Sequence, residues 1–187
     1  MDSAPKVEPD DRYRLFVALP LPEDSRRRLV RWQLDALPAP SADARLVPPE
    51  NLHVTLAFLG SRPAAELPAI AAELAGAART GERPVLTAER YRESRSVGMV
   101  VLADEDGRAG RLAGDVAERL ARLGVYRPEE RPWLPHVTVL RFRSRPRLAP
   151  VPPDLGRVSP SDVALYTSVL RRTGAQYAIR DAFPLGG

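Results

Sequence analysis

The tripeptide His-Val-Thr occurs twice in this chain, and this repeat limits the possible folds more than any other feature of the sequence. It lies at 53–55 within NLHVTLAFLG and again at 136–138 within PHVTVLRFR, and the chain has no other histidine. Polar and apolar residues alternate in both segments, which is typical of a β-strand with one buried face. We therefore expect two related strands, one in each half of the chain, and an internally duplicated fold.

Each of these strands is expected to carry an imidazole and a hydroxyl on one face. Side chains alternate between the faces of a strand, so His53 and Thr55 lie on one face and Val54 on the other. The same rule places His136 and Thr138 together. A single histidine in a strand usually has a structural role, with its hydrogen bonds satisfied by the protein. Two histidines in matched segments instead favour a shared functional site.

The remaining pattern predicts an α+β class rather than an alternating parallel one. Apolar periodicity predicts strands at 14–19, 53–59, 84–91, 97–103, 136–142, 162–170 and 177–183, and helices at 22–37, 63–81 and about 112–124. Helical spacing predicts a buried face in each of these helices: Val30, Leu34 and Leu37 in the first, Leu67, Ile70 and Leu74 in the second, and Leu112, Val116, Leu120 and Leu123 in the third. We expect a disordered leader at 1–11 and a single two-lobed domain at 12–187.

Composition excludes several classes of site. Because cysteine is absent, the chain has no disulfides, iron-sulfur clusters, thiolate zinc sites or cysteine nucleophiles, and a reducing cytoplasm fits. No apolar run approaches the roughly 20 residues of a membrane span, so we expect a soluble protein. Lys6 is the only lysine among 28 basic residues. Arginine suits phosphate ligands, although a GC-rich coding bias also explains an arginine-rich chain.

Three chemistries use histidines in this way. Zinc sites usually add a third protein ligand, and neither strand has a carboxylate two or four residues after its histidine. A Ser-His-Asp triad needs a nucleophile elbow, and no G-x-S-x-G is present. Acid and base catalysis needs one neutral and one protonated imidazole, which two histidines supply near neutral pH. This arrangement suits cleavage of a phosphodiester without a metal.

Four segments carry a resemblance to a known family: RLFVALPL, PPENLHVTLAFLG, RPWLPHVTVLRFR and LYTSVLRRTGAQY. Together they resemble the 2H phosphoesterase superfamily, in particular the RNA 2',3'-cyclic phosphodiesterases once called 2'-5' RNA ligases. The resemblance runs from about residue 12 to 183. It implies a bilobal α+β fold with pseudo-twofold symmetry, in which two antiparallel sheets form a central cleft and helices pack outside.

The resemblance also implies roles for individual residues. His53 and His136 match the two catalytic histidines, and Thr55 and Thr138 match the threonines that bind the phosphate. Arg141 matches an arginine that often follows the second motif and would neutralise the phosphate.

Three further residues are candidates for substrate binding. Phe16 is similar to an aromatic residue near the nucleobase, with a core phenylalanine as the alternative, and Arg143 and Tyr166 are the other two. The family often has a tryptophan near Leu46 and an acidic residue near Thr167. Contacts with the base are therefore expected to differ in this chain.

The implied activity is hydrolysis of a terminal ribose 2',3'-cyclic phosphate to a 2'-phosphate, without a metal or another cofactor. His136 is expected to be the base for water and His53 the acid for O3', while the reverse reaction would form a 2'-5' linkage. The expected partners are RNA or nucleotides with 2',3'-cyclic phosphate ends, and the protein is expected to be a cytoplasmic monomer. The alternative is a nucleotide- or RNA-binding module with the same cleft and little turnover.

Overall fold

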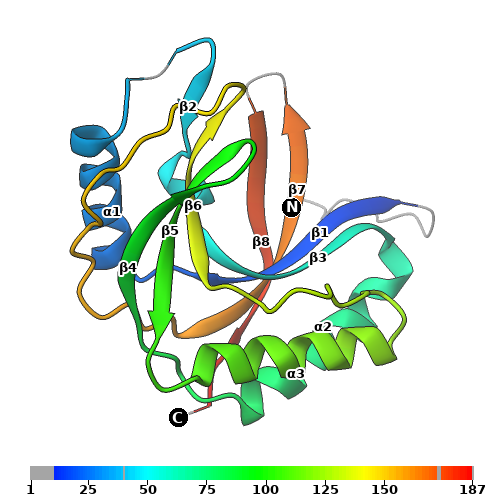
Figure 1. The fold of residues 1–187 in the computed structure, drawn as a ribbon. Coiled ribbons are helices and arrows are strands. Elements are labelled where there is room, and N and C mark those ends of the chain that lie inside the picture. Colours follow the sequence, from blue (N-terminus) through cyan, green and yellow to red (C-terminus); the bar gives the residue numbers. More distant parts are fainter. Residues whose placement is uncertain (1–10, 40, 172–173, 187) are drawn as a thin grey trace, which may run out of the picture.

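The computed structural model describes residues 11–39, 41–171 and 174–186, so positions 1–10 of the predicted leader lie outside the described residues. The elements shown in Figure 1 are β1 (Arg12–Pro20), α1 (Glu23–Ala36), β2 (Ala44–Leu46), β3 (His53–Pro63), α2 (Leu67–Thr80), β4 (Leu86–Glu93), β5 (Val97–Asp104), α3 (Arg108–Arg122), β6 (His136–Phe142), β7 (Asp162–Arg171) and β8 (Gly174–Pro184). Short 3-10 helices lie at Pro49–Asn51 and Ala64–Glu66. The predicted α+β class is confirmed, and β2 is the strand that the sequence pattern missed.

The strands form one antiparallel sheet in the order β4-β5-β6-β3-β1-β7-β8, with β2 paired to β6. Its two halves meet where β3 and β6 pair through Val54 and Val137 alone. The two antiparallel sheets that the resemblance implies correspond to these two halves, and this residue pair joins them into one curved sheet. The two predicted histidine strands are the strands that meet at this junction.

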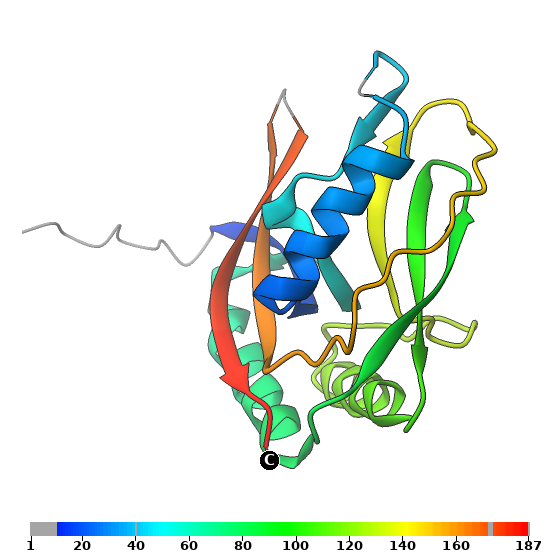
Figure 2. The ribbon, with the colours of Figure 1, turned by 90° about the vertical axis from the view of Figure 1, so that its left-hand side faces the viewer.

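The helices cover the sheet at two places. Figures 1 and 2 show α2 and α3 side by side across one end of the sheet, while α1 lies apart from them. The predicted apolar stripe of α2 is buried at Leu67, Ile70 and Leu74. In α3, Leu120 is buried as predicted, but Leu123 is 37% exposed because it lies beyond the last helical turn.

The buried face of α1 agrees with the predicted one only in part, since Leu37 is buried and Val30 is half-buried. Leu34 is 69% exposed, and the helix instead buries Ser25, Leu29 and Gln33. The buried amide of Gln33 is satisfied because its Nε2 donates to the carbonyl oxygens of Val47 (3.1 Å) and Val139 (2.8 Å). A polar residue thus joins α1 to the back of β6.

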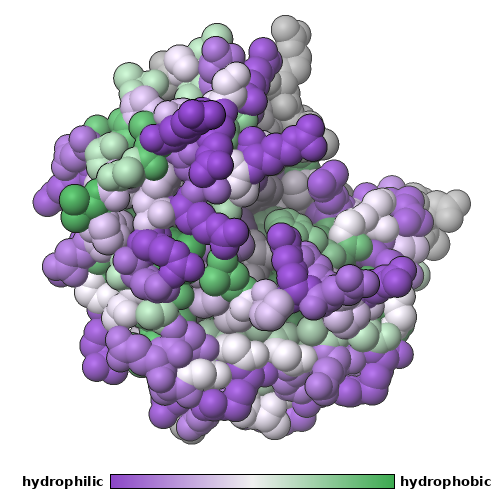
Figure 3. Space-filling view, viewed as in Figure 1, coloured by the Kyte–Doolittle hydropathy of each residue, from purple (hydrophilic) through white to green (hydrophobic). Residues whose placement is uncertain are grey.

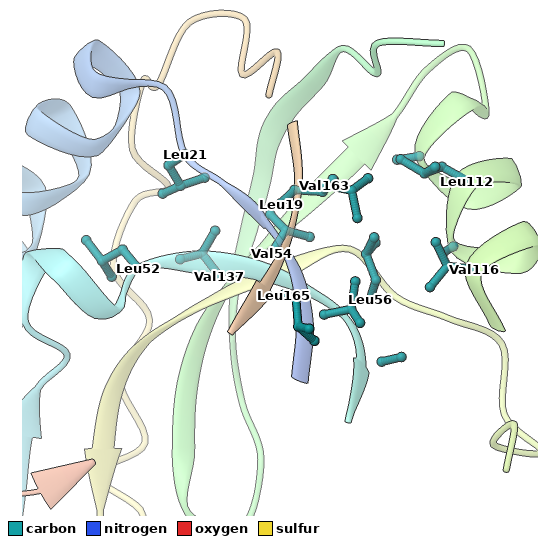
Figure 4. Packing of buried hydrophobic residues seen from close by; sticks show 14 of the residues in the cluster. Leu19, Leu21, Leu52, Val54, Leu56, Leu112, Val116, Val137, Val163 and Leu165 are labelled. Carbon is teal, nitrogen blue, oxygen red and sulfur yellow. The ribbon is translucent and has the colours of Figure 1, made fainter. Parts of the chain in front are cut away.

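The core beneath the two histidine strands is apolar and closely packed. Val54 and Val137 are both 0% exposed, so the strand junction is anchored from below. Figure 4 shows them among leucines from neighbouring elements, with Leu112 and Val116 of α3 at one side of the same cluster. This packing fixes the positions of β3 and β6 and therefore of the histidines on their other face.

Glu93 holds the segment that leaves β6. Its carboxylate accepts hydrogen bonds from the backbone N–H groups of Leu148 (2.8 Å) and Arg147 (3.0 Å) and from Nε of Arg145 (3.0 Å). Burial opposes ionisation, but these hydrogen bonds outweigh it and lower the pKa of Glu93. The ionised carboxylate therefore stabilises a turn in which Arg147 has a φ of 58°.

No helix within the described residues is both long enough and apolar enough to cross a membrane.

Candidate active site

The two His-x-Thr segments come together at the junction of β3 and β6. Their register partners are the middle residues, Val54 and Val137. In an antiparallel pair this register sets His53 opposite Thr138 and Thr55 opposite His136. All four polar residues are half-buried while both valines are buried, so the predicted alternation of faces is observed.

A pocket opens over this face. Its lining includes His53 and Thr55 of β3, Thr138 and Arg141 of β6, Arg45 of β2 and Tyr177 of β8. Figure 3 shows a hollow on this side of the molecule with hydrophilic residues around it. Groups that titrate, donate hydrogen bonds and carry positive charge therefore surround one concave space, as an anionic ligand requires.

Four of the predicted residues lie outside the lining. His136 stands next to the pocket on β6, close enough for its charge to act on His53. Phe16 is only 2% exposed and stacks on Tyr166 with 4.8 Å between ring centroids, so both lie beneath the pocket. Arg143 is exposed just after β6, where its backbone N–H donates to the carbonyl of Asp43.

His53 sits in an aromatic environment. Its ring centroid lies 4.9 Å from Phe16, 5.5 Å from Tyr177 and 5.6 Å from Tyr166, and its Nε2 shares a 3.1 Å hydrogen bond with Oγ1 of Thr55. Phe16 thus packs beneath the imidazole. It is a core residue, as the alternative prediction had it, and it also lies next to the site.

This environment lowers the pKa of His53 from 6.5 to about 4. Burial is the main cause, the backbone of Asn51 acts in the opposite direction, and the charges of Arg141 and His136 lower the pKa further. Within the described residues, no group meets Nδ1 with hydrogen-bond geometry. His53 is therefore neutral at physiological pH until an anion beside it favours the imidazolium.

His136 has a different partner. Its Nδ1 lies 2.8 Å from the carbonyl oxygen of Leu134. Because a carbonyl only accepts hydrogen bonds, Nδ1 carries the proton and Nε2 of the neutral ring keeps a free lone pair. This tautomer suits a general base, and it agrees with the role that the resemblance implies for His136.

Trp133 connects this arrangement to the other motif. Its Nε1 donates to the backbone carbonyl of Thr55 on β3 at 3.0 Å. Trp133 precedes Leu134, whose carbonyl orients His136. The indole therefore ties the segment that orients one histidine to the strand that carries the other.

We expect Trp133→Phe to lower kcat up to about tenfold, because loss of a hydrogen bond worth about 1 kcal/mol lets the Leu134 carbonyl move away from Nδ1. KM should change little, and steady-state kinetics on a cyclic nucleotide measure both constants. Trp32→Phe is the matched control, since Trp32 donates to the carbonyl of Val151 at 2.8 Å and lies outside the pocket lining. Equal losses of kcat in the two variants would show that Trp133 acts only through stability.

Several pocket residues were not predicted from the sequence. Phe58 is 66% exposed at the pocket, although simple alternation from His53 would turn it to the opposite face. A β-bulge explains the change, because Thr55 pairs with Ala18 and Ala57 with Val17, which leaves one extra residue on β3. One sequence does not reveal such a shift in strand pairing. Arg45, Asn51 and Tyr177 also line the pocket.

A metal centre finds no support in the described part of the chain, where no group of three or more His, Cys, Asp or Glu side chains is arranged to hold an ion.

Comparison with known proteins gives consistent matches. Residues 19–92 match a family model described as LigT like Phosphoesterase. A protein of Escherichia coli K12 named RNA 2',3'-cyclic phosphodiesterase is 32% identical, over 88% of this chain and 92% of its own length. A protein of the same name from Thermus thermophilus is 35% identical, over 93% of this chain and 91% of its own length.

Solved structures agree with this result. A crystal structure of E. coli LigT complexed with 3'-AMP has a TM-score of 0.78 and 30% identity, and the match covers 95% of this chain and 100% of that one. A crystal structure of a Thermus thermophilus protein has a TM-score of 0.78 and 31% identity, with 93% and 98% covered.

Proposed function

The chain belongs to the LigT-like phosphoesterases, and from this membership we propose that it is an RNA 2',3'-cyclic phosphodiesterase. The observation that carries the proposal is the meeting of two His-x-Thr segments over one pocket, each imidazole opposite the threonine of the other strand. Relatives that span nearly the whole chain bear this enzyme name. A structure of E. coli LigT complexed with 3'-AMP supports a nucleotide site in this pocket.

The proposed reaction is hydrolysis with one histidine as base and the other as acid. Nε2 of His136 takes a proton from water, the water oxygen forms a bond to phosphorus, and the bond from phosphorus to O3' breaks. His53 gives its proton to O3', so the products are a 2'-phosphomonoester and a free 3'-hydroxyl. The free lone pair at Nε2 of His136 supports its role as the base.

The acid role of His53 depends on the substrate. Burial keeps the pKa of this imidazole at about 4. A bound phosphate anion next to the ring favours the imidazolium and raises the pKa again. Substrate binding therefore brings a proton to the residue that must donate one.

The other motif residues hold the phosphate. The hydroxyls of Thr55 and Thr138 donate to its nonbridging oxygens, and the guanidinium of Arg141 neutralises the negative charge. Run in reverse, the same site joins a 5'-hydroxyl to the cyclic phosphate in a 2'-5' linkage. The proposal includes a monomeric, cytoplasmic enzyme that needs no metal and no other cofactor.

We expect an oligoribonucleotide with a 2',3'-cyclic phosphate end to be converted to the 2'-phosphate in the presence of EDTA, because only imidazoles are needed for proton transfer. Chromatography against 2'-phosphate and 3'-phosphate standards identifies the product. Activity that disappears in EDTA and returns with zinc or manganese would contradict the metal-independent mechanism. Tight binding without turnover would instead favour the nucleotide- or RNA-binding module.

A further inference from the structure

Two buried side-chain atoms have no hydrogen-bond partner within the described residues, and they lie on neighbouring parts of one segment. They are Oδ1 of Asn51 and Nδ1 of His53, and both residues line the pocket. Leu52, which lies between them, is buried and has an extended backbone with a φ of −82° and a ψ of 117°. The side chains of Asn51 and His53 therefore project to the same side of the chain.

The amide of Asn51 is held in one orientation. Its Nδ2 donates to the carbonyl oxygen of Ala175, at the start of β8, over 2.8 Å. Because a carbonyl only accepts hydrogen bonds, the amide cannot turn over, and Oδ1 remains on its other side. Asn51 is only 7% exposed, and an unsatisfied buried acceptor costs free energy. Oδ1 therefore needs a donor from its immediate surroundings.

The proposed acid role supplies this donor on His53. Both ring nitrogens of an imidazolium carry a proton. Nε2 lies 3.1 Å from Oγ1 of Thr55, whereas Nδ1 has no partner within the described residues. A buried cation is costly unless its hydrogen bonds are made. The imidazole can approach Oδ1 by turning about χ2, because the energy minimum of this torsion is broad.

The other groups around the imidazole do not offer it an anionic partner. The titratable and charged groups of the described residues that surround the ring are two tyrosines, the second histidine and two arginines: Tyr166, Tyr177, His136, Arg141 and Arg45. None of them is a carboxylate. The positive charges of Arg141 and His136 oppose protonation of the ring, so the oxygen of Asn51 is an acceptor that can favour it.

We propose that Asn51 is a positioning residue for the general acid, and that its Oδ1 accepts a hydrogen bond from Nδ1–H of the His53 imidazolium. This inference rests on the part of the proposed function that makes His53 the acid. The hydrogen bond stabilises the protonated ring when the phosphate binds, and it fixes the rotation of the ring that presents Nε2–H to O3'. The bond from Nδ2 to Ala175 keeps the amide in place while the ring changes its charge.

The test measures the pKa of His53 by NMR of histidine-labelled protein from pH 3.5 to 9, with and without inorganic phosphate. The chain has two histidines, and His136→Ala identifies the signal of His53. Asn51→Leu keeps the branched shape and removes the acceptor, so the pKa of His53 should fall below its wild-type value. Asn51→Asp keeps the shape and adds a negative charge, so the pKa should rise by at least about one unit.

The two variants separate the proposed role from a structural one. Both lose the hydrogen bond to Ala175, and both keep the backbone of residue 51, which also acts on His53. A structural role alone therefore predicts shifts of the same sign. Gln33→Leu is the matched control, because Gln33 is also a buried amide that donates to backbone carbonyls but lies outside the pocket lining. It should leave the pKa of His53 unchanged, and circular dichroism checks the fold of each variant.

Kinetics connect the hydrogen bond with the reaction. On a cyclic mononucleotide, Asn51→Leu should lower kcat about 10- to 100-fold with little change in KM, the effect of losing one hydrogen bond to a charged group. Shifts of opposite sign together with this loss of kcat support the proposal. Shifts of the same sign, unchanged pKa values, or a wild-type kcat in Asn51→Leu would overturn it, while the proposed phosphodiesterase stands.

Two further outcomes are distinguishable from these. If Asn51→Leu does not fold, Asn51→Asp decides alone, since a His53 pKa no higher than in the wild type overturns the proposal. Wild-type protein that does not hydrolyse a cyclic nucleotide would refute the proposed function, and with it the acid role that this hydrogen bond serves.

Discussion

Replacing either His53 or His136 with alanine should lower kcat by about 10² to 10⁴, the range for loss of one general acid or base. Both imidazoles are half-buried on the pocket side of the sheet, above valines that stay in place, so the fold should survive. Single-turnover assays on a cyclic nucleotide measure the loss. Circular dichroism and denaturant unfolding check that the fold is intact.

The two variants should differ in stability. His53 packs against three aromatic rings, whereas His136 makes one hydrogen bond to a backbone carbonyl, so His53→Ala should unfold at the lower denaturant concentration. His53→Asn fills part of the space without providing a group that titrates, and it separates loss of packing from loss of proton transfer. Turnover close to wild type in His53→Asn or His136→Ala would refute the assignment of that residue.

We expect kcat/KM to depend on pH as a bell, with the acidic limb near pH 4 rather than near 6.5. The reaction needs one proton on the histidine pair, and below the lowered pKa of His53 the pair binds a further proton, so no base remains. The rate constant should then fall about tenfold for each further pH unit. At high pH the pair loses its last proton and kcat/KM falls again.

The measurement is kcat/KM on a cyclic mononucleotide from pH 3.5 to 9, with circular dichroism at each pH to exclude acid unfolding. The acidic limb of kcat should lie at higher pH than that of kcat/KM, because the bound phosphate raises the pKa of His53 in the complex. A flat profile would contradict acid and base catalysis by the pair. A single limb would leave only one histidine in the mechanism.

The part of the site that could be predicted from the sequence is the part that a local sequence pattern determines. The repeated tripeptide gave both strands, the shared face and the four polar residues, because strand alternation needs no knowledge of the rest of the fold. Arg45 was missed because β2 has three residues and no periodicity to detect. Phe58 reaches the pocket through a bulge, which depends on how β1 pairs with β3.

The fold shows the same division. Where apolar residues alone form the buried face of a helix, as in α2, their spacing predicted that face correctly. In α1 a glutamine takes the place of an apolar residue because two carbonyls of distant strands meet its amide. That exchange depends on tertiary contacts, and hydrophobic periodicity therefore selected Leu34 instead of Gln33.

Pairing through Val54 and Val137 relates the two motifs by a half turn, so a phosphate above the junction meets an imidazole and a hydroxyl from either side. The two histidines and two threonines alone therefore do not determine which histidine acts as the acid and which as the base. Direction comes from their unlike neighbours: aromatic rings pack against His53, while the Leu134 carbonyl accepts a hydrogen bond from Nδ1–H of His136. Which oxygen leaves and which attacks is decided outside the repeated tripeptide, by residues such as Phe16 and Trp133 that support the two imidazoles.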